Sequence, residues 1–312
     1  MTRYDAYPPE LQDLVSRAFS RLKGRLEVAA PTLSVHTNEW MHALAPDALP
    51  ETYFTHPQAF PMLLLPWWLE ATVRGVPARA FHGDVVYSTL NGYYFVRMID
   101  DLMDVEHPPG AHVLPSLIVF HTEFQLTYHR HFPHDHPFWQ DFTSASFSAA
   151  ETASLDAGLE TIDREQFLQT SARKIAGAKV PIAAVCHRYG RPDQLGPWSE
   201  LVDLLGCWHQ MLNDMRGWHR DLGRGTNTYF LSEASRHTVQ TASIAEWVVA
   251  EGFDWGFAQL DGWMEQLLAA AHEIDCPPLT AYLEYRFRAL ADDRRSLMPS
   301  VRALRLLATI MH

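Results

Sequence analysis

Hydrophobic residues along this chain recur mostly three or four positions apart, and strand-like alternation is scarce. This spacing predicts long helices in five segments, which are 84–104, 158–186, 198–222, 243–273 and 279–298. Clusters of Pro, Gly and His interrupt the pattern at 106–115, 131–137, 188–197, 223–228 and 275–278. The interruptions are short, and the N-terminal region is also helical in pattern. We therefore expect a single all-α domain over residues 1–312, with about ten helices.

Composition narrows the class of protein. Of the 312 residues 47% are hydrophobic and 20% are charged, which excludes disorder. The net charge of −12 argues against a nucleic-acid partner, because phosphates require a basic surface. The most apolar stretch, 60–73, is broken by Pro66 and is too short to span a membrane. The first residues do not resemble a signal peptide, and the three cysteines form neither a zinc pattern nor a disulfide framework, so we expect a cytoplasmic protein.

The first acidic cluster lies at the end of the predicted helix 84–104. Asp100, Asp101 and Asp104 form a DDxxD sequence, and on a helix Asp100 and Asp104 project from the same face. Like charges at this spacing destabilise a helix, so the cluster favours a compensating cation. Hard carboxylate oxygens suit Mg²⁺, which commonly bridges a few carboxylates to substrate phosphates. The alternative is an acidic helix end exposed to solvent.

A second polar stripe follows in the predicted helix 198–222. Asn213, Gly217 and Asp221 are spaced by four residues and share one helix face, with Arg220 beside Asp221. Two oxygen ligands separated by a glycine leave room for a water molecule. If this helix and the helix with the DDxxD sequence face each other across a cavity, their acidic groups would bind metal ions on opposite sides of it. We therefore expect a diphosphate to bind between these metal ions. A polar surface stripe is the alternative.

These motifs resemble those of the class I isoprenoid synthase superfamily, which includes terpene cyclases, prenyl diphosphate synthases and squalene/phytoene synthases. The stretch 93–104, YYFVRMIDDLMD, is similar to the aspartate-rich motif, and NDMRGWHRD at 213–221 resembles the cyclase NSE motif. Here Gly217 stands at the serine position and Asp221 at the glutamate position. The resemblance implies a class I terpenoid synthase helical bundle around a central active-site cavity, and it leaves a homodimer open.

Bacterial cyclases also carry an arginine that senses the diphosphate, with a small effector residue four positions later at a helix break. Arg173 and Gly177 match that spacing, Lys174 is a neighbouring candidate, and Asn213 follows 40 residues after Arg173. The alternative for Gly177 is a close helix–helix contact. The C-terminal Arg-Tyr pair of these cyclases has a weaker counterpart in Arg286. Arg294 and Arg295 are alternative candidates for the role of its arginine.

The resemblance implies a reaction in which a prenyl diphosphate ionises to an allylic cation. Three Mg²⁺ ions would be held by the acidic motifs, with Asp100, Asp101, Asp104, Asn213 and Asp221 as ligands. The leaving diphosphate would be neutralised by Arg173, Lys174, Arg220, Arg224 and Arg286. Aromatic faces stabilise passing positive charge, and the candidates near the motifs are Trp67, Trp68, Tyr93, Tyr94, Phe95, Trp208 and Trp218.

The sequence offers four alternatives to a terpene cyclase, and its motifs support them unequally. A chain-elongating synthase is disfavoured, because the second motif lacks DDxxD and the N-terminal RLKGRL (21–26) does not match a Gly-Lys-x-x-Arg site. A squalene/phytoene-type head-to-head prenyl transferase is the main alternative to a cyclase. A ferritin-like di-metal bundle needs two Glu-x-x-His pairs, and the chain has one, at Glu39. A non-catalytic helical scaffold is a further alternative, and the histidines at 129–136 favour a polar loop.

Overall fold

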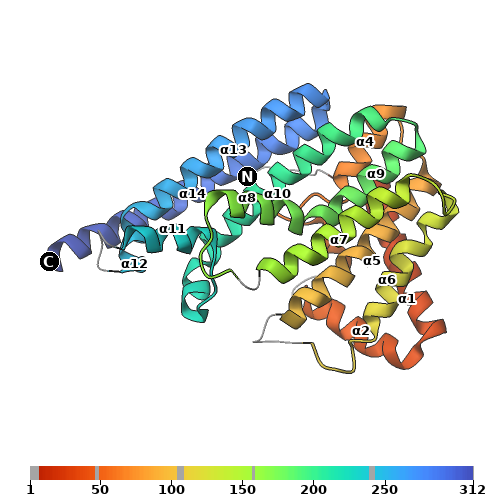
Figure 1. Ribbon diagram of the computed structural model, residues 1–312, viewed down its shortest axis with the longest axis horizontal. Coiled ribbons are helices and arrows are strands. Elements are labelled where there is room, and N and C mark those ends of the chain that lie inside the picture. The colour runs from red at the N-terminus through yellow and green to blue at the C-terminus, as the bar shows by residue number, and fades with distance from the viewer. Residues whose placement is uncertain (1–6, 46–48, 104–108, 157–158, 239–242, 312) are drawn as a thin grey trace. The chain divides into compact units, whose positions relative to one another are not determined.

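The structure is a computed structural model that describes residues 7–45, 49–103, 109–156, 159–238 and 243–311. All regular elements within these ranges are helices (Figure 1), which confirms the predicted all-α fold class. The chain divides into two compact units. Unit 1 comprises residues 1–144 and 177–195, and unit 2 comprises residues 145–176 and 196–312. The prediction of a single domain over 1–312 stays a prediction.

Unit 1 is organised around the long helix α5 (Arg79–Met103), which packs against α1, α6 and α9. Helix α5 is buried along much of its length, from Val85 through Leu90 to Met98, and the buried residues include polar Ser88 and Asn91. The other helices of this unit are α1 (Pro9–Ala29), α2 (Pro31–Ala43), α3 (Pro50–Thr55), α4 (Leu64–Arg74), α6 (Ser116–Leu126), the short η1 (Tyr128–Arg130), the start of α7 (Phe138–Asp156) and α9 (Lys179–Arg188).

Unit 2 contains the long antiparallel pair of α13 (Phe253–Ile274) and α14 (Pro277–Met311), drawn in blue in Figure 1. The turn between them uses Asp275 in the left-handed region, with φ of 55°. Buried Leu260, Trp263 and Leu267 recur at helical spacing along α13. The remaining elements are the end of α7, α8 (Arg164–Lys174), most of α10 (Pro192–Arg224), α11 (Tyr229–His237), α12 (Ile244–Trp247) and the π-helical η3 (Val248–Gly252).

The predicted helix 158–186 is wrong as one continuous element. Helix α8 begins after Asp163, whose carboxylate accepts from the Gln166 amide at 2.8 Å while the Gln166 side chain accepts from the Asp163 amide. This reciprocal capping satisfies two backbone donors and starts the helix later than the apolar pattern indicates. The helix ends at Lys174, and a 3₁₀ turn, η2 (Ala176–Ala178), precedes α9.

Two helices extend further than the sequence predicts. Helix α10 starts at Pro192 and contains Pro197, although the segment 188–197 reads as a break. Helix α14 continues past Pro299, beyond the predicted end at 298. In both cases the proline removes only one backbone donor. Buried Trp198 and Leu201 follow Pro197, and buried Met298 and Val301 flank Pro299, so packing keeps the chain helical at both positions.

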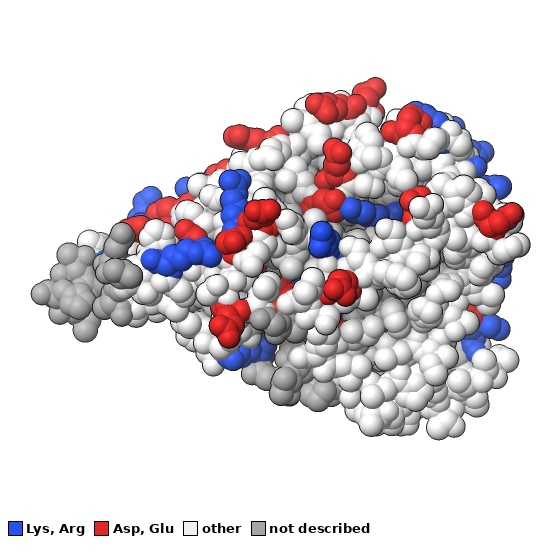
Figure 2. Space-filling view, in the orientation of Figure 1, with Lys and Arg blue, Asp and Glu red and all other residues white. Residues whose placement is uncertain are grey.

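Other global features agree with the sequence. The three cysteines are buried free thiols. Acidic and basic side chains are interspersed on the face drawn in Figure 2, as expected for an acidic chain with many ion pairs. Within the described ranges, no helix has both the length and the apolar character that crossing a membrane requires.

Candidate active site

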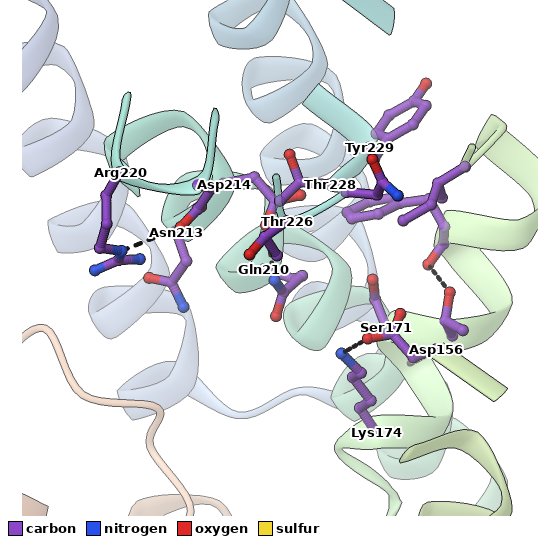
Figure 3. Close-up of a pocket in the computed structure, with 15 residues that line it drawn as sticks. Asp156, Ser171, Lys174, Gln210, Asn213, Asp214, Arg220, Thr226, Thr228 and Tyr229 are labelled. Carbon is purple, nitrogen blue, oxygen red and sulfur yellow. Dashed lines mark hydrogen bonds and ion pairs between the residues drawn. The ribbon is translucent and has the colours of Figure 1, made fainter. Parts of the chain in front are cut away.

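A cavity of about 190 Å³ lies within unit 2, between α8 and α10 and beside the segment that leads into α11 (Figure 3). Its wall combines charged, amide and aromatic side chains. The lining residues are Asp156, Ile162, Phe167, Thr170, Ser171, Lys174, Gln210, Asn213, Asp214, Arg220, Asp221, Thr226, Asn227, Thr228 and Tyr229. Four of these were predicted site residues, namely Lys174, Asn213, Arg220 and Asp221, so the structure brings them together in one cavity.

Helical spacing explains why α10 contributes so many of these groups. Gln210, Asn213, Asp214 and Asp221 fall on one face of the helix, at intervals of three, four, seven and eight residues. The adjoining wall is fixed by Thr228, whose hydroxyl caps α11 by accepting from the Leu231 amide at 3.2 Å. A helix face and a capped helix start therefore hold the polar groups in place.

Arg220 and Asp221 form an ion pair in the cavity wall. The Arg220 Nε donates to Asp221 Oδ1 at 3.1 Å, and the Asp221 side chain is mostly buried. A Cβ atom at Gly217 would lie 2.8 Å from both Arg220 Nη2 and Asp221 Oδ2. The two side chains therefore occupy the space that a side chain at position 217 would fill, and only glycine leaves this pair undisturbed.

Asp214 is a buried acid that the sequence interpretation did not select. The residue is 4% exposed, and its Oδ1 accepts from Gln210 Nε2 at 2.7 Å. Burial disfavours the charged carboxylate and raises the pKa of Asp214 to about 7. Its position four residues after Gln210 and seven before Asp221, on the same helix face, is the sequence signal that could have identified it.

Asp156 was also missed by the sequence interpretation. It is the last residue of α7, and its carboxylate forms an ion pair with the Lys174 ammonium at the end of α8 (Figure 3). Both side chains line the cavity and both are partly exposed. The sequence separation of 18 residues gives no spacing rule from which this contact could be derived.

The apolar part of the wall is aromatic. The Phe167 ring stacks on Tyr229, with centroids 4.6 Å apart and an interplanar angle of 20°, and it also stacks on Trp263 at 5.6 Å. Ile162 completes this side of the cavity. The cavity wall therefore combines charged groups with a hydrocarbon-like surface.

The aromatic candidates proposed from the sequence occupy other positions. None of the seven is among the residues that line this cavity. Trp68, Tyr94 and Trp208 are almost fully buried, which is the ordinary packing role of a core aromatic residue. Phe167 and Tyr229 lie outside the acidic motifs, so proximity to the motifs could not have found them.

Arg173 and Gly177 frame the predicted helix break. Arg173 is exposed in the last turn of α8 and lies outside the cavity lining, while Gly177 lies in the 3₁₀ turn that follows. A Cβ atom at Gly177 would meet no atom within 4 Å, so a close helix–helix contact does not explain this glycine. A helix break is therefore present here, as the resemblance implied and in contrast to the continuous helix 158–186 that the apolar pattern predicted. The sensor and effector roles stay predictions.

Arg224 and Arg286 also lie outside the cavity lining. Arg224 is exposed at the end of α10. Arg286 is only 3% exposed, its Nη1 donates to the Tyr282 hydroxyl at 2.6 Å, and its guanidinium lies 4.9 Å from the Trp208 ring centroid. Their predicted roles as diphosphate ligands stay predictions.

The DDxxD sequence lies in unit 1, at the end of α5. Asp100 is exposed, and Asp104 lies outside the described residues. Asp101 accepts from Arg97 at 2.8 Å and from the Trp40 indole Nε1 at 3.2 Å. Burial is the largest single influence on the pKa of Arg97 and acts to lower it. The negative charge of Asp101 and of other nearby groups together outweighs burial, so the pKa of Arg97 lies above its usual value. Asp101 thus ties the end of α5 to Trp40.

The oxygen donors on α10 fit Mg²⁺ in their chemistry. Asn213 and Asp221 present an amide and a carboxylate to the same cavity, and Mg²⁺ binds few protein oxygens alongside water and phosphate. Within the described residues, no three His, Cys, Asp or Glu side chains form a metal-binding group on their own. A Mg²⁺ ion at this wall would therefore depend on additional oxygens, such as those of a diphosphate.

Comparison with solved structures shows which fold the chain has. It resembles a geranylgeranyl pyrophosphate synthetase from the archaeon Geoglobus acetivorans, with a TM-score of 0.65 and 13% identity over 90% of this chain and 98% of that one. It also resembles a polyprenyl synthetase from Streptomyces coelicolor A3(2), with a TM-score of 0.61 and 16% identity over 88% and 99%. No family model and no curated protein sequence matches the chain. The chain thus has the all-helical fold of these isoprenoid-related synthases.

Proposed function

We propose that this chain is a class I terpene synthase that ionises a linear prenyl diphosphate, farnesyl or geranylgeranyl. The reaction releases diphosphate in the presence of Mg²⁺ and yields a terpene hydrocarbon or alcohol. The observation that carries the proposal is the mixed wall of the cavity in unit 2. Arg220 and Lys174 supply positive charge to this wall, and Phe167 and Tyr229 supply aromatic surface.

The charged groups of the wall match the head of such a substrate. Arg220 offers a planar guanidinium that binds phosphate oxygens through two donors, and Lys174 offers a compact ammonium. Fixed positive groups at the point where negative charge develops are an effective means of stabilising a leaving diphosphate. In this proposal both side chains contact the diphosphate directly.

The proposed Mg²⁺ ligands of the cavity are the oxygens of Asn213 and Asp221 on α10. The carboxylates of Asp100 and Asp104 in the DDxxD sequence are a further proposed group of Mg²⁺ ligands. Bound Mg²⁺, three ions in the related cyclases, would supply the charge that neutralises the diphosphate as it leaves. Asp101 has a different role in this proposal. Its bonds to Arg97 and Trp40 position the end of α5 and with it the neighbouring Asp100.

The aromatic part of the wall suits the hydrocarbon chain and the cation derived from it. Buried rings exclude water, which would otherwise quench an allylic cation. An aromatic face also attracts positive charge, by about 0.5–2 kcal/mol for each suitably placed ring. Because Phe167 stacks on both Tyr229 and Trp263, its ring plane is held in a fixed orientation.

Chain elongation is a second candidate, favoured by the names of the two similar structures, both of which are prenyl synthases. In an elongating enzyme the allylic cation is captured by isopentenyl diphosphate. Against this candidate, the second acidic motif of the chain begins with Asn213 and has Gly217 where a DDxxD motif would have an aspartate. A head-to-head condensing enzyme remains the alternative suggested by the sequence.

Incubation of the purified protein with Mg²⁺ and each prenyl diphosphate separates these functions. Gas chromatography of an organic extract should show C15 or C20 hydrocarbons or alcohols without any added isopentenyl diphosphate. Products longer by five carbons that appear only with isopentenyl diphosphate would establish elongation instead, and C30 or C40 products would establish condensation. The absence of both diphosphate release and products would contradict the proposal. Asp221→Asn serves as the inactive comparison.

A further inference from the structure

Asp156 is an acidic side chain in the cavity wall that the proposed reaction does not use. Its carboxylate pairs with Lys174, one of the two cationic residues that we assign to the diphosphate. The other, Arg220, pairs with Asp221. Both cations that line the cavity are thus neutralised by an acid of the same wall (Figure 3).

The Asp156–Lys174 pair is readily opened. The side chains are 28% and 39% exposed, so water already solvates part of each charge. Ion pairs in such surroundings contribute little net stability, because they lose side-chain entropy and are screened by solvent. A diphosphate carries more negative charge than a carboxylate, so it competes effectively for the same ammonium.

The surrounding contacts indicate that this pair is not needed to hold residues 159–162, which precede α8. Three other hydrogen bonds anchor residues 159–162 to the region of α11. The Asn227 amide donates to the Leu159 carbonyl at 3.1 Å, the Arg236 Nη2 donates to the Ile162 carbonyl at 2.8 Å, and the Ile162 amide donates to the Ser232 hydroxyl at 3.0 Å. Loss of the Asp156 charge should therefore leave the fold intact.

We propose that Asp156 is a positioning residue that holds Lys174 in the cavity wall and is replaced at the ammonium by the incoming diphosphate. The inference rests on the proposed function only in taking a diphosphate as the ligand. Ion-pair exchange of this kind favours multiply charged anions, because a singly charged anion gains little by displacing a carboxylate that is already in place. Asp156 thereby tunes the affinity of the cavity through Lys174.

Calorimetric titration with inorganic diphosphate at constant free Mg²⁺ tests this role. Asp156→Asn should bind diphosphate about fivefold more tightly than the unaltered protein, the size expected for release of one partly exposed ion pair. Asp156→Glu should bind like the unaltered protein, because it restores the pair. In a Lys174→Gln background, Asp156→Asn should give no further gain.

Asp292→Asn is the matched control, since it removes one negative charge from an exposed pair with Arg295 on α14 and should leave binding unchanged. Circular dichroism melting verifies that each variant is folded. Unchanged or weaker binding in Asp156→Asn overturns the inference, and so does an equal gain in the Lys174→Gln background, which would indicate plain charge repulsion. Because the probe is inorganic diphosphate, these outcomes are readable even if no prenyl diphosphate is turned over.

Discussion

Arg220 Nε donates to Asp221 Oδ1 at 3.1 Å, and the two side chains cross the helix surface that Gly217 leaves open. The residue proposed to bind diphosphate and the residue proposed to bind Mg²⁺ are thus paired with each other. Either ligand must separate them before it binds fully. A change at position 217 is therefore the most direct way to disturb the pair without removing either charge.

Gly217→Ala should lower turnover of the prenyl diphosphate, because its Cβ displaces the ends of Arg220 and Asp221. Gly223→Ala is the matched control on the same helix, since a Cβ there meets no atom within 4 Å. The control should raise the free energy of unfolding by about 0.5–1 kcal/mol and leave turnover unchanged. Chemical denaturation and product assays check both variants. Equal turnover in the two would contradict the assignment.

Asp100→Ala and Asp101→Asn should have different consequences, although the residues are adjacent. Asp100 is exposed and proposed to bind Mg²⁺, so its loss should reduce turnover by about 10²-fold or more with little change in stability. Asp101 pairs with Arg97, so its loss should lower the free energy of unfolding by about 1 kcal/mol. Activity and melting measurements on both variants are the test. Full activity in Asp100→Ala would remove Asp100 from the metal site.

His209 should make the chain less stable at mildly acidic pH. Burial, together with the charges of Arg286 and Arg216, lowers the pKa of His209 from 6.5 to about 4. Between pH 6.5 and about 4, His209 is protonated in the unfolded chain and neutral in the folded chain. The free energy of unfolding therefore falls as the pH is lowered through this range. The contribution is at most about 3 kcal/mol.

Denaturation of His209→Gln across that pH range measures the effect. Asp214 contributes with the opposite sign, because its raised pKa makes the folded state the stronger proton binder. The quantity to compare is thus the difference between the variant and the unaltered protein. This difference should grow in favour of the variant as the pH is lowered, and a constant difference would show that His209 titrates normally.

Phe167→Leu should change the product mixture, because Phe167 lines the cavity and orients the stack with Tyr229 and Trp263. Phe120→Leu is the control, since Phe120 is a fully buried residue of unit 1 that does not line this cavity. Both should lose about 1–2 kcal/mol of stability from imperfect repacking. Gas chromatography should distinguish only Phe167→Leu. The same product mixture in both variants would place the hydrocarbon chain elsewhere.

The sequence predicts the fold well where one physical effect dominates. Apolar periodicity places the greater part of α5, α10 and α13 correctly, because burial decides their structure. It does not separate α12 and η3 from α13 within the predicted segment 243–273. It misplaces the start of α8, although the capping box of Asp163 and Gln166 is visible in the sequence. Pro197 falls in a segment read as a break, and the predicted helix 279–298 ends just before Pro299, because local proline preference is easier to see than tertiary packing.

The site is predictable to the extent that it lies on a single helix. Asn213, Arg220 and Asp221 share one face of α10, and helical spacing alone places them together. Asp156 and Lys174 belong to two different helices, α7 and α8, so no helical periodicity describes their contact. Phe167 and Tyr229 meet through the packing of α8 against α11, a tertiary event that residue types do not reveal.

The pairing of acids and bases in the cavity wall also affects how fast a ligand arrives. Lys174 and Arg220 are both compensated by nearby carboxylates, and the chain as a whole carries a charge of −12. A free diphosphate at a distance thus experiences repulsion, with no attractive field to steer it. Its association rate should rise with ionic strength, as screening weakens the repulsion. In such a cavity the direct contacts provide selectivity, while the long-range repulsion lowers the association rate. Mg²⁺ bound to the diphosphate would reduce its negative charge and so raise that rate.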